Sequence, residues 1–580
     1  MPNKAMSRFQ TEAVINTLEY VEIPTHETLR QLSPAFVRSL AHELAVLSLR
    51  GRVCPVGFSD GSVGVFTLLE YCHDDQTRAV LELLKRRGLR LSQPQLFVLP
   101  PALLLAIDKS ADEQNAALIG AYPDRQAQQG ALSAAFDALL RWGVVRRASD
   151  IHFNVNRNRY SSPVFFTLAG RYVSPSEFSS LPTSTVLDML AVAWMDIEGG
   201  NGAVFDPMIE QQGRLSRLVD GQKLLLRWAS LATDVGPSVC LRLLVMDESK
   251  LTPDLHELGY LPEQIALFER LSLTDGGAVV LAGTVGSGKS TTIATLMRAI
   301  APDRKVITLE DPAEYLIPNA LQNTVCRSFS EQDDHAFDSK LKAIKRSAMN
   351  DLLIGEIRDH TTGRAFMDLA ACGVNLYTTV HAGSALLIPD RLASSFIGVA
   401  RDLLATPGIL KLLVFQALML KLCPRCSLTF DQARVQPQWR CALGQVRTQA
   451  WLDNWVSGLE VSLGLSRSTL RFRNEQACLD CDHSISSLRG TAGRTVVAEM
   501  IDPVREPEFL EGVKNKDGVG LYQWFTQRNQ QALLLAEPQR QSAQQIAIYK
   551  MAQGLLDPRD VQARFGDFDV LQAQRGVVRA

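Results

Sequence analysis

A run of glycine, lysine and hydroxyl residues near the middle of the chain has the spacing of a phosphate-binding loop. It reads G-x-x-x-x-G-K-S, and its residues are Gly283, Thr284, Val285, Gly286, Ser287, Gly288, Lys289 and Ser290, followed by Thr291. Amides in such a loop can surround a β-phosphate, and the start of a following helix favours an anion. Lys289 would reach the β- and γ-phosphates, and the Ser290 hydroxyl would bind Mg²⁺. The pattern predicts an ATP site; the alternative is a turn that only joins a strand to a helix.

Three further polar clusters each follow an apolar, strand-like run. Glu310 and Glu314 come after the first run, Glu356 after the second and His381 after the third. Carboxylates beside a triphosphate must bind Mg²⁺ or position water, because bare carboxylates would repel the phosphates. An imidazole at a strand end could sense the γ-phosphate. Each cluster alone is more often structural, but all three together with the loop favour catalysis.

Two strand-like stretches upstream of the loop carry arginines. Arg227 lies in L-L-L-R-W, and Arg242 lies in V-C-L-R-L-L. Solvated strand arginines are the ordinary interpretation. The competing interpretation is that both arginines reach a neighbouring nucleotide.

Four of the ten cysteines form two C-x-x-C pairs, Cys423/Cys426 and Cys478/Cys481. The other cysteines are scattered, as expected for buried thiols. In a cytosolic chain, paired C-x-x-C spacing indicates metal before disulfides. Four reduced structural cysteines are the alternative.

The composition is that of an ordinary globular protein. Lys and Arg number 60 against 62 acidic residues, so the total charge gives no reason to expect nucleic acid or an anionic membrane as a partner. The first residues contain no apolar signal-peptide core, and no apolar run reaches spanning length, the nearest being residues 409–420 with Lys411 inside it. We therefore expect a cytosolic protein without direct membrane insertion.

The elements that must position these groups suggest several domains, because 580 residues exceed one core. Residues 1–120 mix strand-like stretches with helical patterns at 33–49 and 75–87, and 121–131 suits a linker. Residues 132–247 are rich in strands. From 248 to 580, apolar strands at 278–282, 305–309, 351–354 and 374–380 alternate with helical patterns. That alternation predicts an α/β domain with a mostly parallel sheet, whose function gathers at the carboxyl ends of its strands.

Together these residues resemble the secretion ATPase superfamily, and within it the assembly ATPases of type II secretion systems and type IV pili. The stretch V-I-T-L-E-D-P-A-E-Y, which contains Glu310 and Glu314, is similar to the family's Asp box. I-G-E-I-R-D around Glu356 is similar to its Walker B segment, and T-T-V-H-A-G-S-A around His381 to its His box. A-S-D-I-H at 148–152 and the motif from Gly490 to Glu499 also match. The resemblance covers residues 130 to 565.

The chain departs from the family pattern at three places. The usual Walker B aspartate is replaced by Asn350, the His box has Gly383 and Ser384 in place of Asn-Asp, and about 51 residues separate Cys426 from Cys478. These differences suggest a divergent branch, such as one that serves a conjugative or bundle-forming pilus. They leave Glu356 as the principal catalytic carboxylate.

The resemblance implies a RecA-like ATPase domain at 248–580, a PAS-like α+β domain at 132–247 and an additional α/β docking domain at 1–120. It implies a homo-hexamer that hydrolyses ATP with Mg²⁺, in which Arg227 and Arg242 act on nucleotide in trans and His381 links γ-phosphate loss to movement. The joint would lie near residues 247–255. An inner-membrane platform protein would receive the stroke. Four thiolates at 423–481 would hold Zn²⁺ in a small excursion with little core of its own, which favours assembly over retraction.

Two other functions share the phosphate-binding loop. A DNA-translocating or conjugation ATPase would show DNA-stimulated turnover that depends on salt. A regulatory scaffold would bind ATP tightly without releasing phosphate.

Overall fold

The structure is a computed structural model of the chain. It describes residues 20–107 except 25, 42, 45, 47, 48, 50, 102, 105 and 106, and then residues 125–246, 252–325, 332–436, 439–483, 485–534 and 537–566. The chain divides into two compact units, residues 1–243 and 244–580. Residues 247–251 of the predicted joint lie outside the described residues.

The first sheet of unit 1 has five strands in the order β1-β5-β4-β3-β2. Its elements are β1 (Tyr20–Glu22), α1 (His26–Arg30), β2 (Phe36–Ser39), β3 (Val53–Phe58), β4 (Val63–Thr67), α2 (Asp75–Arg86) and β5 (Leu91–Val98). The helix expected at 75–87 is confirmed as α2. The helix expected at 33–49 is wrong, because the segment contains β2. Phe36 packs on Phe66, 5.5 Å between ring centroids, and β2 pairs with β3, so tertiary pairing overrides the local helical pattern.

The second sheet of unit 1 has six strands in the order β11-β12-β13-β6-β8-β9. Its elements are α4 (Arg125–Val145), β6 (Ala148–Asn154), β7 (Ser161–Ser162), β8 (Val164–Leu168), β9 (Arg171–Val173), β10 (Leu181–Pro182), α5 (Thr183–Trp194), β11 (Gln211–Val219), β12 (Gln222–Leu231) and β13 (Ser238–Val245). Alternate residues of β12, Leu224, Leu226 and Trp228, are fully buried, as expected for a sheet covered on one face. Helix α4 begins inside the stretch expected to be a linker, 121–131.

Unit 2 contains a seven-stranded sheet in the order β16-β15-β17-β18-β14-β19-β22. The first six strands run parallel, and β22 pairs antiparallel with β19. The bounds are β14 (Ala278–Ala282), β15 (Val306–Glu310), β16 (Ala320–Thr324), β17 (Asp351–Ile354), β18 (Asn375–Val380), β19 (Leu410–Leu422) and β22 (Thr491–Ile501). The predicted mixed α/β fold with a mostly parallel sheet is confirmed.

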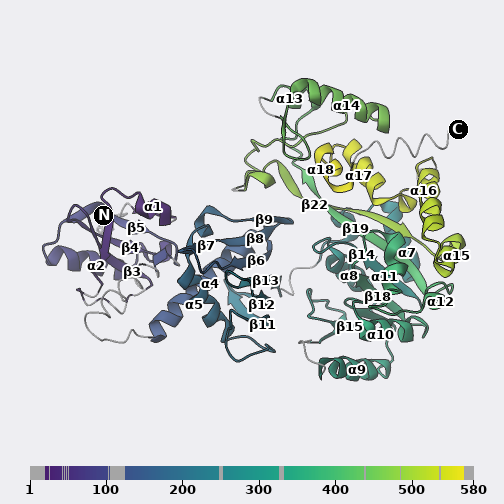
Figure 1. Ribbon diagram of the computed structural model, residues 1–580, viewed down its shortest axis with the longest axis horizontal. Helices are drawn as coiled ribbons and strands as arrows, with labels where there is room; N and C mark the ends of the chain where they lie inside the picture. The colour runs from purple at the N-terminus through teal and green to yellow at the C-terminus, as the bar shows by residue number, and fades with distance from the viewer. Residues whose placement is uncertain are drawn as a thin grey trace, which may run out of the picture. The chain divides into compact units, whose positions relative to one another are not determined.

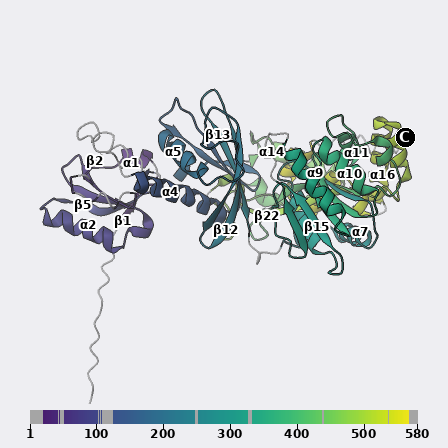
Figure 2. The ribbon, with the colours of Figure 1, turned by 90° about the horizontal axis from the view of Figure 1, so that it is seen from below.

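Helices cover both faces of this sheet, as Figures 1 and 2 show. One core joins α7 (Pro262–Ser272) and α8 (Lys289–Arg298) to the face that carries Val279 and Leu281. The other core joins helices to the face that carries Ala278, Val280 and Ala282. Its helices include α9 (Gln332–Lys345), α10 (His360–Ala370), α11 (Ile388–Leu392), α12 (Arg401–Leu404), α15 (Pro507–Asn515) and α16 (Gly518–Leu534). Strand β14 is therefore buried on both sides, which explains its unbroken apolar sequence.

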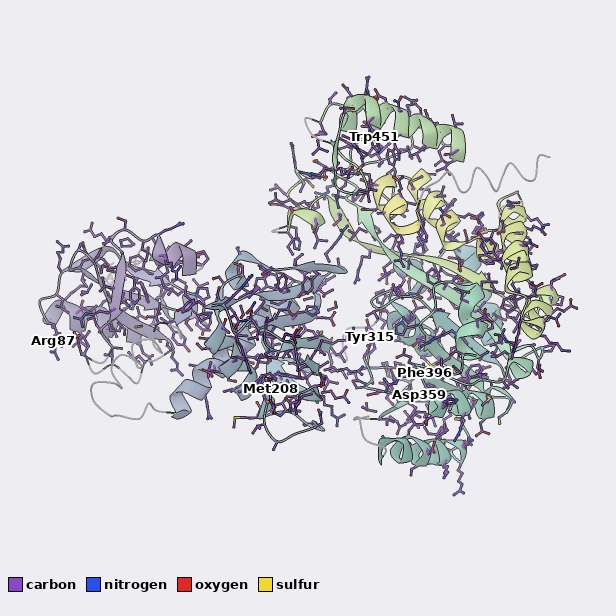
Figure 3. The ribbon with its side chains drawn as sticks, viewed as in Figure 1. Arg87, Met208, Tyr315, Asp359, Phe396 and Trp451 are labelled. Atoms are coloured by element: carbon purple, nitrogen blue, oxygen red, sulfur yellow. The ribbon has the colours of Figure 1, made fainter. Side chains whose placement is uncertain are left out.

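A segment between β19 and β22 packs around a further hydrophobic core of this unit, separate from the two cores on the faces of the sheet. It contains α13 (Phe430–Arg434), β20 (Trp439–Arg440), β21 (Val446–Arg447) and α14 (Gln449–Leu463). Trp451, labelled in Figure 3, lies in this segment. The ring centroids of Trp439, Trp451 and Trp455 lie 5.5 to 5.7 Å apart, and Phe472 joins the same core. The same cluster also contains Ala417 and Met419 of β19, Val497 of β22 and apolar residues between 546 and 561. The insertion therefore shares its core with the rest of unit 2, in keeping with the expectation that it has little core of its own.

The last described helices, α17 (Ala543–Ala552) and α18 (Pro558–Phe565), pack against that core. Asp557 caps α18 and forms a buried ion pair with Arg559, Oδ2 to Nη2 2.7 Å, and it accepts a hydrogen bond from the backbone amide of Arg473 at 2.7 Å. The Arg559 charge holds the pKa of Asp557 below its usual range despite burial. The insertion is therefore tied to the end of the chain by charge as well as by packing.

Candidate functional site

The phosphate-binding motif forms the predicted strand, loop and helix. Strand β14 ends at Ala282, and α8 begins at Lys289. Three glycines of the loop have positive φ: 154° at Gly283, 75° at Gly286 and 85° at Gly288. At Gly283 a Cβ would also lie only 2.5 Å from the carbonyl oxygen of Gln416. Glycine is required there both for the backbone conformation and for the close approach.

Lys289 and His381 converge on one atom of the loop, the carbonyl oxygen of Gly283. Lys289 Nζ donates to it at 2.8 Å and to the carbonyl of Thr284 at 3.2 Å. His381 Nδ1 lies 3.2 Å from the same Gly283 oxygen. These contacts hold the ammonium over the loop, where phosphate oxygens could replace the carbonyls as acceptors.

Glu356 lies on the other side of the His381 ring, with Oε1 3.1 Å from Nε2. Their side chains are 34 % and 42 % exposed, so solvent and small ligands can reach both. The sheet order explains the meeting, because β18, which ends before His381, lies between β14 and β17. The carboxyl ends of three adjacent parallel strands thus bring the loop, the carboxylate and the imidazole together.

The acidic cluster after β15 also lies at this edge of the sheet. Glu310 accepts a hydrogen bond from Gln322 Nε2 at 3.3 Å, and burial raises the pKa of its carboxyl. The charge of nearby Glu314 raises that pKa further and also raises the pKa of Tyr315, for which burial is the main cause. Tyr315, labelled in Figure 3, is hydrogen-bonded to Thr291 at 2.8 Å between hydroxyl oxygens. The cluster is therefore linked to the first turn of α8.

Asn350 lies at the opposite end of β17 from Glu356. Its Oδ1 accepts a hydrogen bond from the amide of Lys305 at 2.8 Å, just before β15. The neighbouring Asp351 is 1 % exposed and bonds to Arg304 Nε at 2.7 Å. At about 3.3 Å per extended residue, Asn350 and Glu356 are roughly 20 Å apart along the chain. The asparagine therefore does not replace a group beside the loop.

Arg227 and Arg242 both belong to unit 1 and lie on the less buried face of its second sheet. Arg227 on β12 is opposite Arg214 on β11. Arg242 Nε donates to Asp150 Oδ1 at 3.0 Å, across the β13–β6 pair. The aspartate of the A-S-D-I-H motif thus holds Arg242 within its own sheet.

The four paired cysteines come together at the base of the insertion. The Sγ atoms of Cys423, Cys426, Cys478 and Cys481 all lie within 4.8 Å of one another. Three Sγ pairs lie 3.4, 3.6 and 3.8 Å apart. A tetrahedral zinc site with Zn–S bonds of about 2.3 Å requires sulfur atoms about 3.8 Å apart. The donor set and its spacing therefore fit Zn²⁺.

Comparison with known proteins places this arrangement in a family. The family model for "Type II/IV secretion system protein" matches residues 125–550. The chain belongs to this family. Among the described residues, none of the helices has the length and apolar character to span a bilayer.

Several members of the type II/IV secretion family are similar in sequence. Type II secretion system protein E of Klebsiella pneumoniae is 31 % identical over 294 residues, which are 50 % of this chain and 55 % of that protein. The type IV pilus assembly ATPase PilB of Thermus thermophilus is 28 % identical over 290 residues, 50 % of this chain and 31 % of PilB. The chain thus spans about half or less of these curated relatives.

Solved structures with a partial likeness include an ATPase and a pilus retraction motor. The Legionella pneumophila ATPase DotB has a TM-score of 0.45 at 18 % identity, and the aligned residues cover 74 % of this chain and 95 % of DotB. The pilus retraction motor PilT with bound ADP has a TM-score of 0.44 at 19 % identity, and the aligned residues cover 75 % of this chain and 98 % of PilT.

Two buried residues behind the loop belong to none of the motifs, and one of them, Gln416, contacts the loop directly. Gln416 on β19 and Tyr260 after α6 (Leu255–Leu258) are hydrogen-bonded to each other behind the loop. The one available signal is a glutamine inside the otherwise apolar stretch 409–420, where Lys411 is the other polar residue.

Proposed function

We propose that this family member is an ATP-hydrolysing motor that powers assembly of a type IV pilus or of a type II secretion pseudopilus. The observation that carries the proposal is the convergence of Lys289 and His381 on the Gly283 carbonyl, with Glu356 paired to His381. A cation, an imidazole and a carboxylate around one glycine-rich loop suit phosphoryl transfer to water better than simple nucleotide storage.

In this mechanism the loop amides from Gly283 to Thr291 hold the phosphates, and Lys289 exchanges loop carbonyls for phosphate oxygens. Ser290 and Glu356 would hold Mg²⁺, which when bound offsets phosphate charge. Glu356 also orients the attacking water, and Glu310 and Glu314 are further candidates for water activation. His381 contacts both Glu356 and the loop, so it is placed to respond when the γ-phosphate leaves.

The mechanical part of the proposal concerns the rest of the chain. We infer a RecA-like ATPase domain at 248–580, a PAS-like domain at 132–247 and docking by residues 1–120. Six copies would form a ring in which Arg227 and Arg242 act on the nucleotide of a neighbouring subunit, with the joint near 247–255. For Arg242 this requires release from Asp150. The ring would work in the cytoplasm against an inner-membrane platform protein.

The cysteine cluster supports assembly rather than retraction in this proposal. Cys423, Cys426, Cys478 and Cys481 would bind Zn²⁺, and their geometry suits it. Zinc would lock the start of the insertion to the end of β19, where the insertion's apolar core begins.

ATP turnover by the purified full-length chain tests the enzymatic part. We expect turnover with Mg²⁺ that falls by about two orders of magnitude in Glu356→Gln, while ATP binding is retained. Wild-type chain that binds ATP but releases no phosphate would contradict hydrolysis and favour a regulatory scaffold. DNA-stimulated, salt-sensitive turnover would favour a DNA-translocating ATPase.

Metal analysis tests the zinc site separately. Protein purified under reducing conditions without chelator should contain about one zinc per chain, and Cys478→Ser should lose it. Cys372→Ser is a matched control, since Cys372 is exposed and lies outside the cluster. Much less than one zinc in the wild-type chain would contradict the assignment.

A further inference from the structure

Two polar side chains behind the phosphate-binding loop are buried as deeply as the apolar core. Gln416 on β19 has none of its surface exposed, and Tyr260 is 2 % exposed. An amide or hydroxyl in such surroundings is costly unless its hydrogen bonds are made. Their partners therefore indicate what these residues do.

Gln416 contacts the loop through both its side chain and its backbone. Its Nε2 donates to the carbonyl of Ser287 at 2.8 Å. Its own carbonyl oxygen lies 2.5 Å from the place where a Cβ on Gly283 would be, and its Nε2 lies 3.3 Å from the equivalent point on Gly288. Both ends of the loop thus close onto one residue of the neighbouring strand.

Tyr260 determines which way the Gln416 amide points. The Tyr260 hydroxyl donates to Gln416 Oε1 at 2.6 Å and lies 3.3 Å from the hydroxyl of Thr292 on α8. Burial raises the pKa of Tyr260, so the phenol keeps its proton and remains a donor. Since the donor takes the amide oxygen, Nε2 is left to face the loop. The ring of Tyr260 packs edge-on against Phe268, with centroids 5.4 Å apart.

We propose that Gln416 is a positioning residue that fixes the backbone of the phosphate-binding loop before nucleotide arrives, and that Tyr260 acts through Gln416. The consequence for nucleotide rests on the proposed ATP-binding function. A loop whose amides are already oriented binds phosphate without the cost of ordering. ADP and ATP both carry the β-phosphate that the loop surrounds, so both should depend on Gln416 to the same extent.

The test compares Gln416→Leu with Gln264→Leu in the full-length chain. Gln264 is a matched control because it is 1 % exposed and also makes two hydrogen bonds, to the carbonyl of Ala498 and the amide of Leu261, neither of which belongs to the loop. Two quantities are measured. The first is the amide hydrogen exchange of residues 284–290 without nucleotide, and the second is the Kd for ADP and for ATP in the presence of Mg²⁺. We expect Gln416→Leu to speed exchange in the loop and to raise both Kd values about tenfold. Gln264→Leu should leave the loop exchange and the two Kd values near those of the wild-type chain.

Tyr260→Phe tests the second part with a smaller change, because it keeps the ring and its contact with Phe268. It should raise both Kd values less than Gln416→Leu, and it should add nothing in a Gln416→Leu background. If Gln416→Leu does not fold, Tyr260→Phe still tests whether the Tyr260–Gln416 pair orients the loop. Equal loop exchange and equal Kd values in the Gln416, Gln264 and Tyr260 variants would overturn the inference. If the wild-type chain binds no nucleotide, the proposed function fails, whereas loop exchange still decides whether Gln416 holds the loop.

Discussion

The two ends of the seven-stranded sheet both carry charged groups, but they use them differently. At the amino end, Asp351 is 1 % exposed and is bonded to Arg304 and to Asn375, at 2.7 and 3.0 Å. At the carboxyl end, Glu356 is 34 % exposed and contacts His381. One strand, β17, thus leads from a saturated, buried carboxylate to an accessible one.

The difference teaches which charges are available to a ligand. A buried charge in a complete network can leave its partners only at a large cost in free energy. Lys411 continues the amino-end network, since its Nζ donates to Asn375 Oδ1 at 2.8 Å. At the carboxyl end, Lys289 donates to loop carbonyls that phosphate oxygens can replace. We expect changes at the amino end to alter stability and changes at the carboxyl end to alter activity.

The largest effect on activity is expected for Lys289→Ala. ATP turnover should fall about 10³-fold, because the phosphates lose their principal cation. The free energy of unfolding should change by less than about 1 kcal/mol, because the ammonium donates to carbonyls of a loop at the edge of the sheet and not within the apolar core. A steady-state phosphate-release assay and chemical denaturation check both parts. Unchanged turnover would contradict the assignment of the loop.

Asp351→Asn is expected to lower the stability of the fold and to leave ATP binding nearly unchanged. Removing the carboxylate charge leaves Arg304 without its buried partner, and unit 2 should lose about 3 kcal/mol of stability. Arg304 also pairs with Asp275 at 2.9 Å, which limits the loss. The Kd for ATP of the folded protein should stay within about twofold of wild type. A Kd that rises as much as it does in Lys289→Ala would break the distinction between the two ends.

The amino-end network also predicts a dependence of stability on pH. Burial lowers the pKa of Lys411 to about 8, although the charge of Asp351 opposes the shift. An unfolded lysine has a pKa of about 10.4, so the unfolded state binds more protons between these values and stability rises with pH. The gain between pH 8 and 10 should be about 2 kcal/mol.

Lys411→Met is the comparison that isolates this effect, since other groups titrate in both proteins. Chemical denaturation from pH 7.5 to 10 should give a flatter profile for Lys411→Met than for wild type. Parallel profiles would mean that Lys411 stays charged in the folded protein.

The smallest effect is expected for Asn350→Asp, which restores the family's usual residue. Its side chain would still accept the hydrogen bond from the Lys305 amide, at the end of β17 away from the loop. Turnover should stay within about twofold of wild type, and stability within about 0.5 kcal/mol. A large rise in turnover would show that position 350 influences the phosphate site across the length of the strand.

Much of the fold of unit 2 could be predicted because its signals are local. The apolar strands at 351–354 and 374–380 are confirmed within a residue, and the loop lies between the expected strand and helix. The insertion could not be predicted in the same way. Its core is assembled from Trp439, Trp451, Phe472 and helix α17, which are far apart in the chain. Likewise β2 became a strand because β3 lies beside it, and no pattern within 33–49 reveals that neighbour.

The site shows the same division between local and distant information. Glu356 and His381 could be chosen from their motifs. Their contact could not be predicted, because it requires β18 to lie between β14 and β17. Gln416 could not be chosen at all, since a polar residue in a strand has many possible partners and its partner Ser287 is 129 residues away.

The sequence by itself determined the position of the glycine-rich loop, the family and the cysteine pairs, because each depends on residue types at short, fixed spacings. Only the tertiary structure decided that Asn350 lies at the far end of β17, that the insertion shares a core with α17 and α18, and that Gln416 and Tyr260 support the loop. The physical reason is that burial and hydrogen bonding join residues that are distant in the chain. Their partners are set by strand order and packing, which no local spacing records.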